Sequence, residues 1–583
     1  MTGVEMTAQS SIEKGKSTAM TSPDTLDVDA QSAQSPRPRT MTPLRSMALV
    51  TTCTLAMITN LASSAAVSVF LPIIGQELNV AEDSLQWTVS AFSLSSGCFL
   101  IFFGRLADLY GRKKAFLLGT FFLGAMSIGC GFAQNAVTLY VLRGLQGLGP
   151  AAFLPACLGI LAQSFPHGRA RSAAFATFSA GAPLGGAIGT QIGALLTEKT
   201  RYTWRDPFFL FAGLSFLCVI GGYLTIEPDS RVTKVQIQND SNKTTGESVS
   251  KRIGVDWIGA FLITTALGLI IFTLGQGSVA PRGWRTDYII SLLIIGVFFL
   301  LVFLLWQHWL EKHYGAQAPL MKLSLWSRSK GKFAVMQSIA FMEWAGFLSW
   351  FFWAQIYYED FVGLSPVLTA VRMLPMTVAG VICNVFVVLV IGRLDLVVLI
   401  ALGTLFTSIG ALLFALIDPS APYWAFGFPS AIVAVFGGDF VFAAGTLFIA
   451  KISEPDEQSL AGGLFQTLTQ LGTAFGLAIS TIVHSSVTQK HRDSNTGSST
   501  ESPAPLQAYQ AAQWTAFGFA MFCTALAIIF LRGVGPVGAS PGSQGPQAEA
   551  DESRQSQNSV KGEREDLEAA EGKPGVTGTS ADR

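Results

Sequence analysis

The chain has 583 residues, of which 50% are hydrophobic and 13% are charged, whereas soluble domains carry about 25% charged residues. This composition excludes an ordinary water-soluble protein. Lysine plus arginine equals aspartate plus glutamate at 38 each, so no excess charge indicates a nucleic-acid partner.

The polar residues are concentrated in four stretches that separate or flank long apolar runs. These stretches are rich in Ser, Gln, Gly, Pro, Lys and Glu, and they cannot bury much apolar surface. We therefore predict that they are disordered or loosely ordered: 1–45, 227–252, 486–511 and 533–583.

Seven cysteines are scattered through the apolar runs, with no CxxC pair and no Cys/His ligand spacing. The pattern predicts free buried thiols and no metal site. No cofactor is expected either. A phosphate-cradling GxxxxGK[ST] loop is absent from the sequence, which argues against an ATP-driven pump.

The apolar runs are long enough to cross a membrane. A transmembrane helix needs about 20 mostly apolar residues, because its backbone polar groups must be satisfied within the segment. Fourteen runs meet this need, which predicts an all-α polytopic membrane protein in a lipid bilayer. The runs are 46–71, 86–103, 115–133, 137–163, 173–196, 207–226, 255–276, 287–309, 333–357, 366–390, 396–416, 424–450, 459–483 and 513–531.

Basic residues predict the orientation of these spans. The loops on the side that includes 104–114 hold 18 Lys and Arg, and the loops on the other side hold seven. Cytoplasmic loops carry the excess of basic residues. Both termini are therefore expected in the cytoplasm, and the sequons at Asn239 and Asn242 are expected to stay unglycosylated.

The loop predicted after the second span carries a spaced motif. Gly104 and Gly111 allow a tight turn, Asp108 can face a helix N-terminus or a basic side chain, and Arg105 and Arg112 belong to a basic cluster. An ordinary basic loop would explain the charges alone. The full spacing resembles the G-x-L-a-D-r-x-G-r-k signature of the major facilitator superfamily, with Leu109 in place of a usual basic residue. The resemblance implies a gating role.

Arg143 lies in the fourth apolar run, where a charged group is costly unless it is paired or faces water. An arginine that snorkels to the interface is the alternative. The stretch from Arg143 through Gln146 to Pro150 resembles the R-x-x-q-G-x-g signature of proton-coupled facilitators. This implies a role for Arg143 in proton or substrate coupling, and Gln146 is a candidate for the substrate cavity.

The fifth run carries glycines every four residues, with a proline and a further glycine beside them: Gly181, Gly185, Gly189 and Gly193, then Pro183 and Gly186. Such a stripe lets another helix approach closely, and ordinary helix packing would explain it as well. It resembles the glycine-proline signature of drug:proton antiporters, although Ala182 precedes the proline and one residue fewer follows it.

Further motifs resemble the fourteen-span drug:proton antiporter family, closest to its fungal aminotriazole-resistance branch. They include 84–87, 204–209, 255–259, 363–366, 437–440 and 458–462. The resemblance implies the major facilitator fold, with two six-helix halves plus two additional central helices. The predicted domains are a tail 1–45, a half 46–226, a loop 227–254, two central helices 255–309, a loop 310–332, a half 333–532 and a tail 533–583.

Two acidic residues lie deep in predicted spans. Glu343 is in the ninth and Asp439 in the twelfth, and an ionisable group at membrane depth is a candidate for proton transfer. A carboxyl hydrogen-bonded to a neighbouring helix is the alternative. We assign Asp439 to proton coupling, where the resembling branch also carries an acid. Glu343 is a further candidate for coupling, or for the cavity or cation recognition.

The ninth run is also rich in aromatic residues. Interfacial belts explain most such residues, but aromatic walls also line small-molecule sites. Trp344, Trp350 and Phe351 are therefore candidates for the substrate cavity.

We predict that the protein is a monomeric efflux pump that exchanges protons for a small organic compound such as a drug, toxin or secondary metabolite. Residence in the plasma membrane is expected, with the vacuolar membrane as the alternative. A transporter of ammonium or borate is the runner-up. A membrane-embedded enzyme and a non-transporting sensor are less favoured, because no nucleophile–base pair or folded output module is evident.

Overall fold

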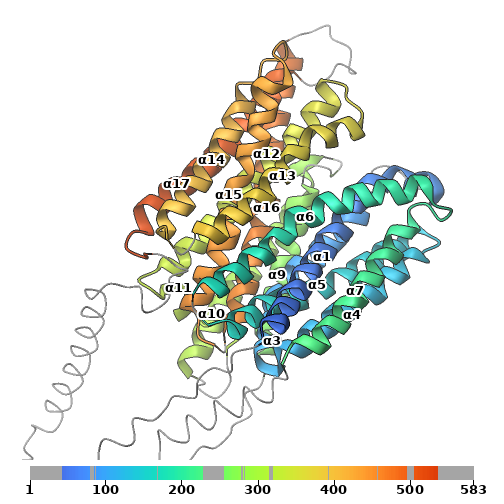
Figure 1. Ribbon diagram of the computed structural model, residues 1–583. Helices are drawn as coiled ribbons and strands as arrows, with labels where there is room; N and C mark the ends of the chain where they lie inside the picture. The colour runs from blue at the N-terminus through green and yellow to red at the C-terminus, as the bar shows by residue number, and fades with distance from the viewer. Residues whose placement is uncertain are drawn as a thin grey trace, which may run out of the picture. The chain divides into compact units, whose positions relative to one another are not determined.

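The computed structural model describes residues 42–78, 85, 87–166, 168–227, 255–277, 280, 282–313, 319–390, 393–455, 457–494 and 505–535. In these ranges the regular structure is helical, and fourteen of the α-helices have 20 residues or more (Figure 1). Their bounds are α1 Pro43–Leu78, α3 Trp87–Tyr110, α4 Arg112–Gly131, α5 Ala136–Ser164, α6 Arg169–Lys199, α7 Arg205–Thr225, α9 Trp257–Gln276, α10 Asp287–His313, α12 Lys332–Ile356, α13 Pro366–Val390, α14 Leu396–Ala415, α15 Tyr423–Ile452, α16 Gln458–Ser494 and α17 Leu506–Phe530.

Short helical turns connect some of these helices. They are η2 Gly283–Arg285 before α10, α11 Ser324–Ser327 before α12, and the π-helical turn η3 Tyr357–Phe361 after α12. The predicted run 366–390 has the same bounds as α13. Each of the other runs overlaps one long α-helix, because a run of about 20 apolar residues already defines a membrane helix. However, α1, α3 and α16 end well after their runs, at Leu78, Tyr110 and Ser494, and α17 begins well before its run, at Leu506.

Twelve helices of the described chain are apolar and long enough to cross a membrane. The chain is thus a multi-pass membrane protein. Of the fourteen long helices, α6 and α12 are not among the twelve. Helix α6 is rich in Gly, Ser and Thr, and α12 carries Glu343 and two glutamines.

The helices form two groups with a pair between them in the sequence. The N-terminal half consists of α1 and α3–α7, the C-terminal half of α12–α17, and the central pair of α9 and α10. The halves meet where α3 packs on α16 and where α6 packs on α13 (Figure 1). Helix α9 packs on α10 and also touches α3 and α16. The central pair therefore lies beside the contact of α3 with α16.

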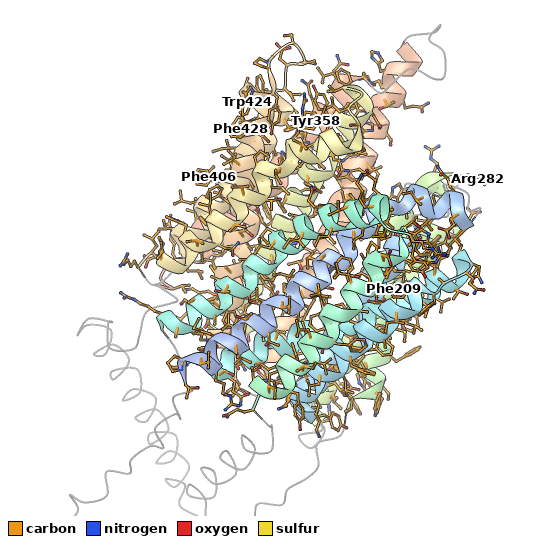
Figure 2. The ribbon with its side chains drawn as sticks, turned by 45° about the vertical axis from the view of Figure 1, so that its right-hand side comes forward. Phe209, Arg282, Tyr358, Phe406, Trp424 and Phe428 are labelled. Carbon is orange, nitrogen blue, oxygen red and sulfur yellow. The ribbon has the colours of Figure 1, made fainter. Side chains whose placement is uncertain are left out.

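Burial distinguishes interior helices from peripheral ones. The most apolar window is 89% buried in α5 and 83% buried in α15, but only 17% buried in α10. Figure 2 shows Trp424, Phe428 and Phe406 along one edge of the C-terminal half, and Trp424 is 69% exposed. Exposed apolar side chains of this kind fit a lipid-facing surface.

The polar stretches are only partly described. Residues 1–41, 228–254 and 536–583 lie outside the described residues, as do both sequons. The prediction of disorder was wrong for 43–45, which begin α1, for 486–494, which continue α16, and for 506–511, which begin α17. A helix satisfies its own backbone hydrogen bonds, so it can extend beyond the apolar segment that starts it.

Candidate functional site

One buried carboxylate joins the end of α3 to the beginning of α16. Asp108 accepts hydrogen bonds from the backbone N–H of Ser459 (3.2 Å) and of Leu460 (2.8 Å). These N–H groups lie in the first turn of α16, where they have no partner within the helix and where the helix dipole favours negative charge. Asp108 therefore holds the two halves together at a helix N-terminus.

Arg112 completes this contact from the first residue of α4. Its guanidinium donates to Asp108 Oδ1 from Nε (3.0 Å) and Nη2 (2.7 Å), and to the carbonyl oxygens of Gly159 and Pro455. Pro455 lies in the turn between α15 and α16. We call Asp108, Arg112, Pro455, Ser459 and Leu460 the inter-half latch.

The turn between α3 and α4 is shorter than predicted. We expected a loop over 104–114, but only Gly111 separates the two helices, at a φ of 113° that favours glycine. Gly104 is inside α3, where an added Cβ would lie 2.9 Å from Ser459 O. Its function in the fold is thus close approach of α3 to α16 rather than a turn. Arg105 is buried on the same helix.

The glycine stripe of α6 faces α1. An added Cβ would lie 3.0 Å from Thr54 O at Gly181, 2.6 Å from Ile58 O at Gly185 and 2.9 Å from Ala66 Cβ at Gly193. At Gly189 it would collide with the backbone of Ala62. Gly186 differs, because nothing lies within 4 Å of its Cβ position. The stripe is therefore a helix contact inside the N-terminal half.

Asp439 lies where α15, α13 and α6 meet. A Cβ on Gly380 of α13 would lie 3.0 Å from Asp439 Oδ2 and 3.2 Å from Pro183 Cβ of α6. Asp439 is 8% exposed, and its Oδ2 has no hydrogen-bond partner among the described residues. Asn384, one turn further along α13, donates to Gly380 O (2.9 Å). An acid of one half and the proline of the other therefore meet at one glycine.

Arg143 is fully buried in the N-terminal half, so it does not snorkel to an interface in this structure. Its guanidinium donates to Thr88 O (2.8 Å) and to Gln146 Oε1 (2.7 Å) and lies over the Phe92 ring, 4.5 Å from the centroid. Gln146 donates onward to Ser127 Oγ (2.6 Å). Within the described chain Arg143 Nη2 has no partner.

Glu343 is fully buried inside the C-terminal half. A Cβ on Gly437 of α15 would collide with its Oε1 and with Thr407 Oγ1 of α14. Both carboxyl oxygens lack a hydrogen-bond partner in the described part of the chain. Gly437 precedes Asp439 by two residues, which is more than half a helical turn. Glu343 and Asp439 therefore lie on different sides of α15, and the three residues proposed for proton coupling do not share one pocket.

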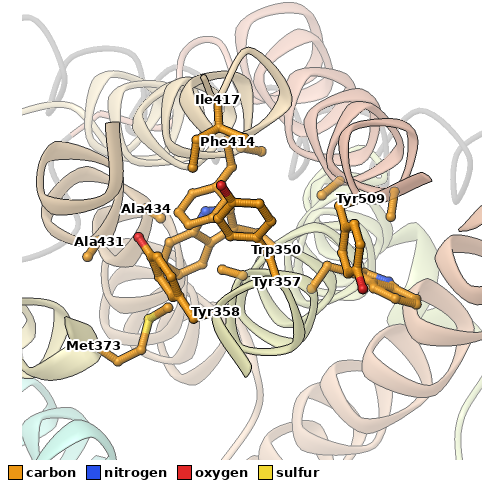
Figure 3. Close-up of a cluster of buried hydrophobic side chains, with 14 residues drawn as sticks. Trp350, Tyr357, Tyr358, Met373, Phe414, Ile417, Ala431, Ala434 and Tyr509 are labelled. Carbon is orange, nitrogen blue, oxygen red and sulfur yellow. The ribbon is translucent and has the colours of Figure 1, made fainter. Parts of the chain in front are cut away.

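The aromatic candidates also separate. The Trp344 ring lies 5.9 Å from that of Phe442 on α15, which stacks at 6.5 Å on Phe178 of α6, so this group bridges the two halves. Trp350 is instead fully buried within the C-terminal half (Figure 3), with its Nε1 donating to Ser430 Oγ (2.9 Å). It lines no open cavity in this conformation. Phe351 packs at the edge of the same cluster.

An ion cluster next to the latch was missed in the sequence. Glu457 accepts ion pairs from Lys322 (2.5 Å) and Arg328 (3.0 Å), and Glu454 lies 3.2 Å from Arg328. The sequence signal was an acidic turn, 454–457, that could match the basic loop 311–332. The basic residues of this loop had predicted only the orientation of the chain in the membrane.

All seven cysteines are free and buried, as predicted. Among the described residues, no group of three or more His, Cys, Asp and Glu side chains could hold a metal ion.

Comparisons with known proteins identify similar chains. Residues 53–321 match the family model described as Major Facilitator Superfamily. A low affinity ammonium transporter of Saccharomyces cerevisiae is 30% identical over 422 residues, covering 72% of this chain and 77% of that protein. An efflux pump of Aspergillus terreus is 25% identical, over 77% of this chain and 82% of the pump. A crystal structure of a human organic anion transporter superposes with a TM-score of 0.56 at 14% identity, over 84% of this chain and all of that one.

Proposed function

This chain belongs to the major facilitator superfamily, and on that premise we propose that it is a proton-coupled efflux pump for a small organic compound. The substrate class is a drug, toxin or secondary metabolite, and the two halves alternate in exposing it. The efflux pump among its relatives supports this direction of transport.

The observation that supports proton coupling is that Asp439 of one half and Pro183 of the other both lie next to Gly380. Asp439 Oδ2 lacks a hydrogen-bond partner among the described residues, so a proton can bind at this oxygen without displacing such a partner. It also lies at a contact between the halves. Binding or loss of its proton can therefore change that contact, which is what coupling requires. We assign Arg143 and Glu343 supporting roles in proton binding at separate positions.

We propose fourteen membrane spans, with α6 and α12 added to the twelve apolar helices. Each is long enough, at 31 and 25 residues, to cross a bilayer. Both helices pack on other helices of the bundle: α6 packs on α1 and α13, and α12 on α16 and α17. This number, with the motifs, supports placement in the drug:proton antiporter family and its aminotriazole-resistance branch.

We further propose that the protein is a monomer in the plasma membrane with both termini in the cytoplasm. The excess of basic residues on the side of the α3–α4 turn supports this orientation. The latch would then close the cytoplasmic end, and the substrate site would open to the outside in this conformation. Residence in the vacuolar membrane is the alternative.

A second candidate function is transport of a small inorganic solute. The ammonium transporter of Saccharomyces cerevisiae is 30% identical to this chain, which favours ammonium over other inorganic ions.

The test uses purified protein in liposomes with an imposed pH gradient. We expect the gradient to drive movement of lipophilic organic probes, and a protonophore to stop it. Radiolabelled methylammonium, assayed in the same liposomes, distinguishes the second candidate. Asp439→Asn should abolish the response to the gradient, whereas the control Glu359→Gln, in η3 after α12, should keep it. Transport that persists without a gradient contradicts proton coupling.

A further inference from the structure

The turn between α15 and α16 is held from two sides. On one side Arg112 binds Pro455 O, and Asp108 binds the N–H groups of Ser459 and Leu460. On the other side Lys322 and Arg328 bind the acids of the same turn. Both contacts act on about one turn of chain, so the position of the latch depends on both.

Glu457 carries the second contact. Its side chain is 1% exposed and receives Lys322 on one oxygen (2.5 Å) and Arg328 on the other (3.0 Å). Glu454 contacts the same two cations but is 55% exposed. A buried charge that loses its partners is costly, whereas an exposed pair contributes little. Glu457 is therefore the acid that fixes the turn.

The backbone on either side of Lys322 is anchored to the central pair of helices. Gln307 of α10 accepts a hydrogen bond from the N–H of Met321 (3.2 Å), and Glu311 accepts one from the N–H of Leu323 (3.1 Å). Gln307 in turn donates to Asp256 (2.6 Å), the N-cap of α9. The segment 321–328 thus forms a strap from the central pair to the α15–α16 turn.

We propose that Glu457 is a positioning residue of the transport cycle. Through Lys322 and Arg328 it holds the α15–α16 turn where Asp108 and Arg112 can bind it, so that the central pair stabilises the closed latch. The inference rests on the proposed function only in treating the latch as a part that opens during transport. Glu457 itself touches neither substrate nor the proton-coupling groups.

The experiment measures latch opening directly. Ser459 is fully buried in the latch, so Ser459→Cys reacts with a maleimide only when the latch opens. The purified full chain is assayed without substrate and without a pH gradient, and labelling of the parent chain, whose own cysteines are buried, is subtracted. Failure of proton-driven transport would leave this result standing.

Glu457→Gln should raise the labelling rate of Ser459→Cys by about tenfold or more. The control Glu454→Gln should change it by less than about twofold. Arg328→Gln should also raise the rate. The double variant with Glu457→Gln should be slower than two independent effects would give, because both substitutions remove the same interaction. Glu457→Asp keeps the charge on a shorter side chain, so its labelling rate should lie between those of the chains with Glu457 and with Glu457→Gln.

The proposal is overturned if Glu457→Gln leaves the labelling rate unchanged, or if Glu454→Gln has an equal effect. Fully additive effects of Glu457→Gln and Arg328→Gln would also overturn it, because the two side chains would then act independently. A uniform fall in thermal stability without faster labelling would assign Glu457 to folding alone.

Discussion

At the scale of single residues, the buried acids of this protein fall into two kinds. Asp108 is held by two backbone N–H groups and by Arg112. Glu343 and Asp439 each keep at least one carboxyl oxygen without a partner in the described chain. A satisfied carboxylate stabilises one arrangement of its neighbours, whereas an unpartnered one remains available for protons. This difference separates the latch from the proposed coupling sites.

The substitution Asp108→Asn tests whether a fully hydrogen-bonded acid stabilises the latch. The substitution removes the charge that Arg112 and the α16 N-terminus both bind, and breaking a buried pair costs about 3–5 kcal/mol. We expect a lower melting temperature of the purified protein and faster labelling of Ser459→Cys. The matched control is Asp395→Asn, because Asp395 is exposed and its side chain makes no cap hydrogen bond to α14. Equal melting temperatures of the two variants would contradict the assignment of Asp108.

At the scale of helices, small residues determine which elements can touch. Gly181, Gly185, Gly189 and Gly193 bring α6 against the α1 backbone. The same helix presents Pro183 to Gly380 of α13. Because α6 contacts both its own half and the other one, its position against α1 also determines how the halves meet.

Gly189→Ala tests this packing. The added methyl group would collide with the Ala62 backbone, and overpacking of this kind costs about 1–3 kcal/mol. Gly186→Ala is the control on the same helix, because its Cβ position is open and alanine favours a helix over glycine by up to about 1 kcal/mol. The melting temperature in detergent should fall for Gly189→Ala and should stay unchanged or rise for Gly186→Ala. The reverse order would show that α6 does not depend on this stripe.

At the scale of the whole molecule, the hydrogen bonds that Asp108, Arg112 and Arg171 make between the halves lie at one end of the bundle, the end that carries the α3–α4 turn. They include Arg171 of α6, which donates to Ala450 O of α15 (2.9 Å). A set of contacts at one end lets the two halves separate at that end when the contacts break. The orientation of the chain then decides which compartment gains access.

Two cysteine variants test the orientation. Arg282 (Figure 2) and Ser327 are exposed and lie before and after α10, so a spanning α10 places them on opposite sides. In intact cells an impermeant maleimide should label Arg282→Cys, and it should label Ser327→Cys only after permeabilisation. The native cysteines are buried and should contribute little background. The opposite pattern would reverse the topology and the proposed direction of export.

The sequence by itself determined the helices and much of their packing. Long apolar runs define membrane helices whatever surrounds them, so each run overlaps one long α-helix, although α16 and α17 extend well beyond their runs. The four-residue spacing of glycines likewise places them on one helical face, and that face contacts α1. These properties depend on residues close together in the sequence, so they can be recognised from a single sequence.

Only the tertiary structure decided which distant residues meet. Nothing in the spacing brings Asp439 to Pro183, or Glu457 to Lys322 and Arg328, because each pairing joins segments more than a hundred residues apart. It also placed Trp350 in a closed cluster and Glu343 on a different side of α15 from Asp439. The direction in which a side chain points depends on how its helix is rotated against its neighbours, and that rotation is set by packing of the whole bundle.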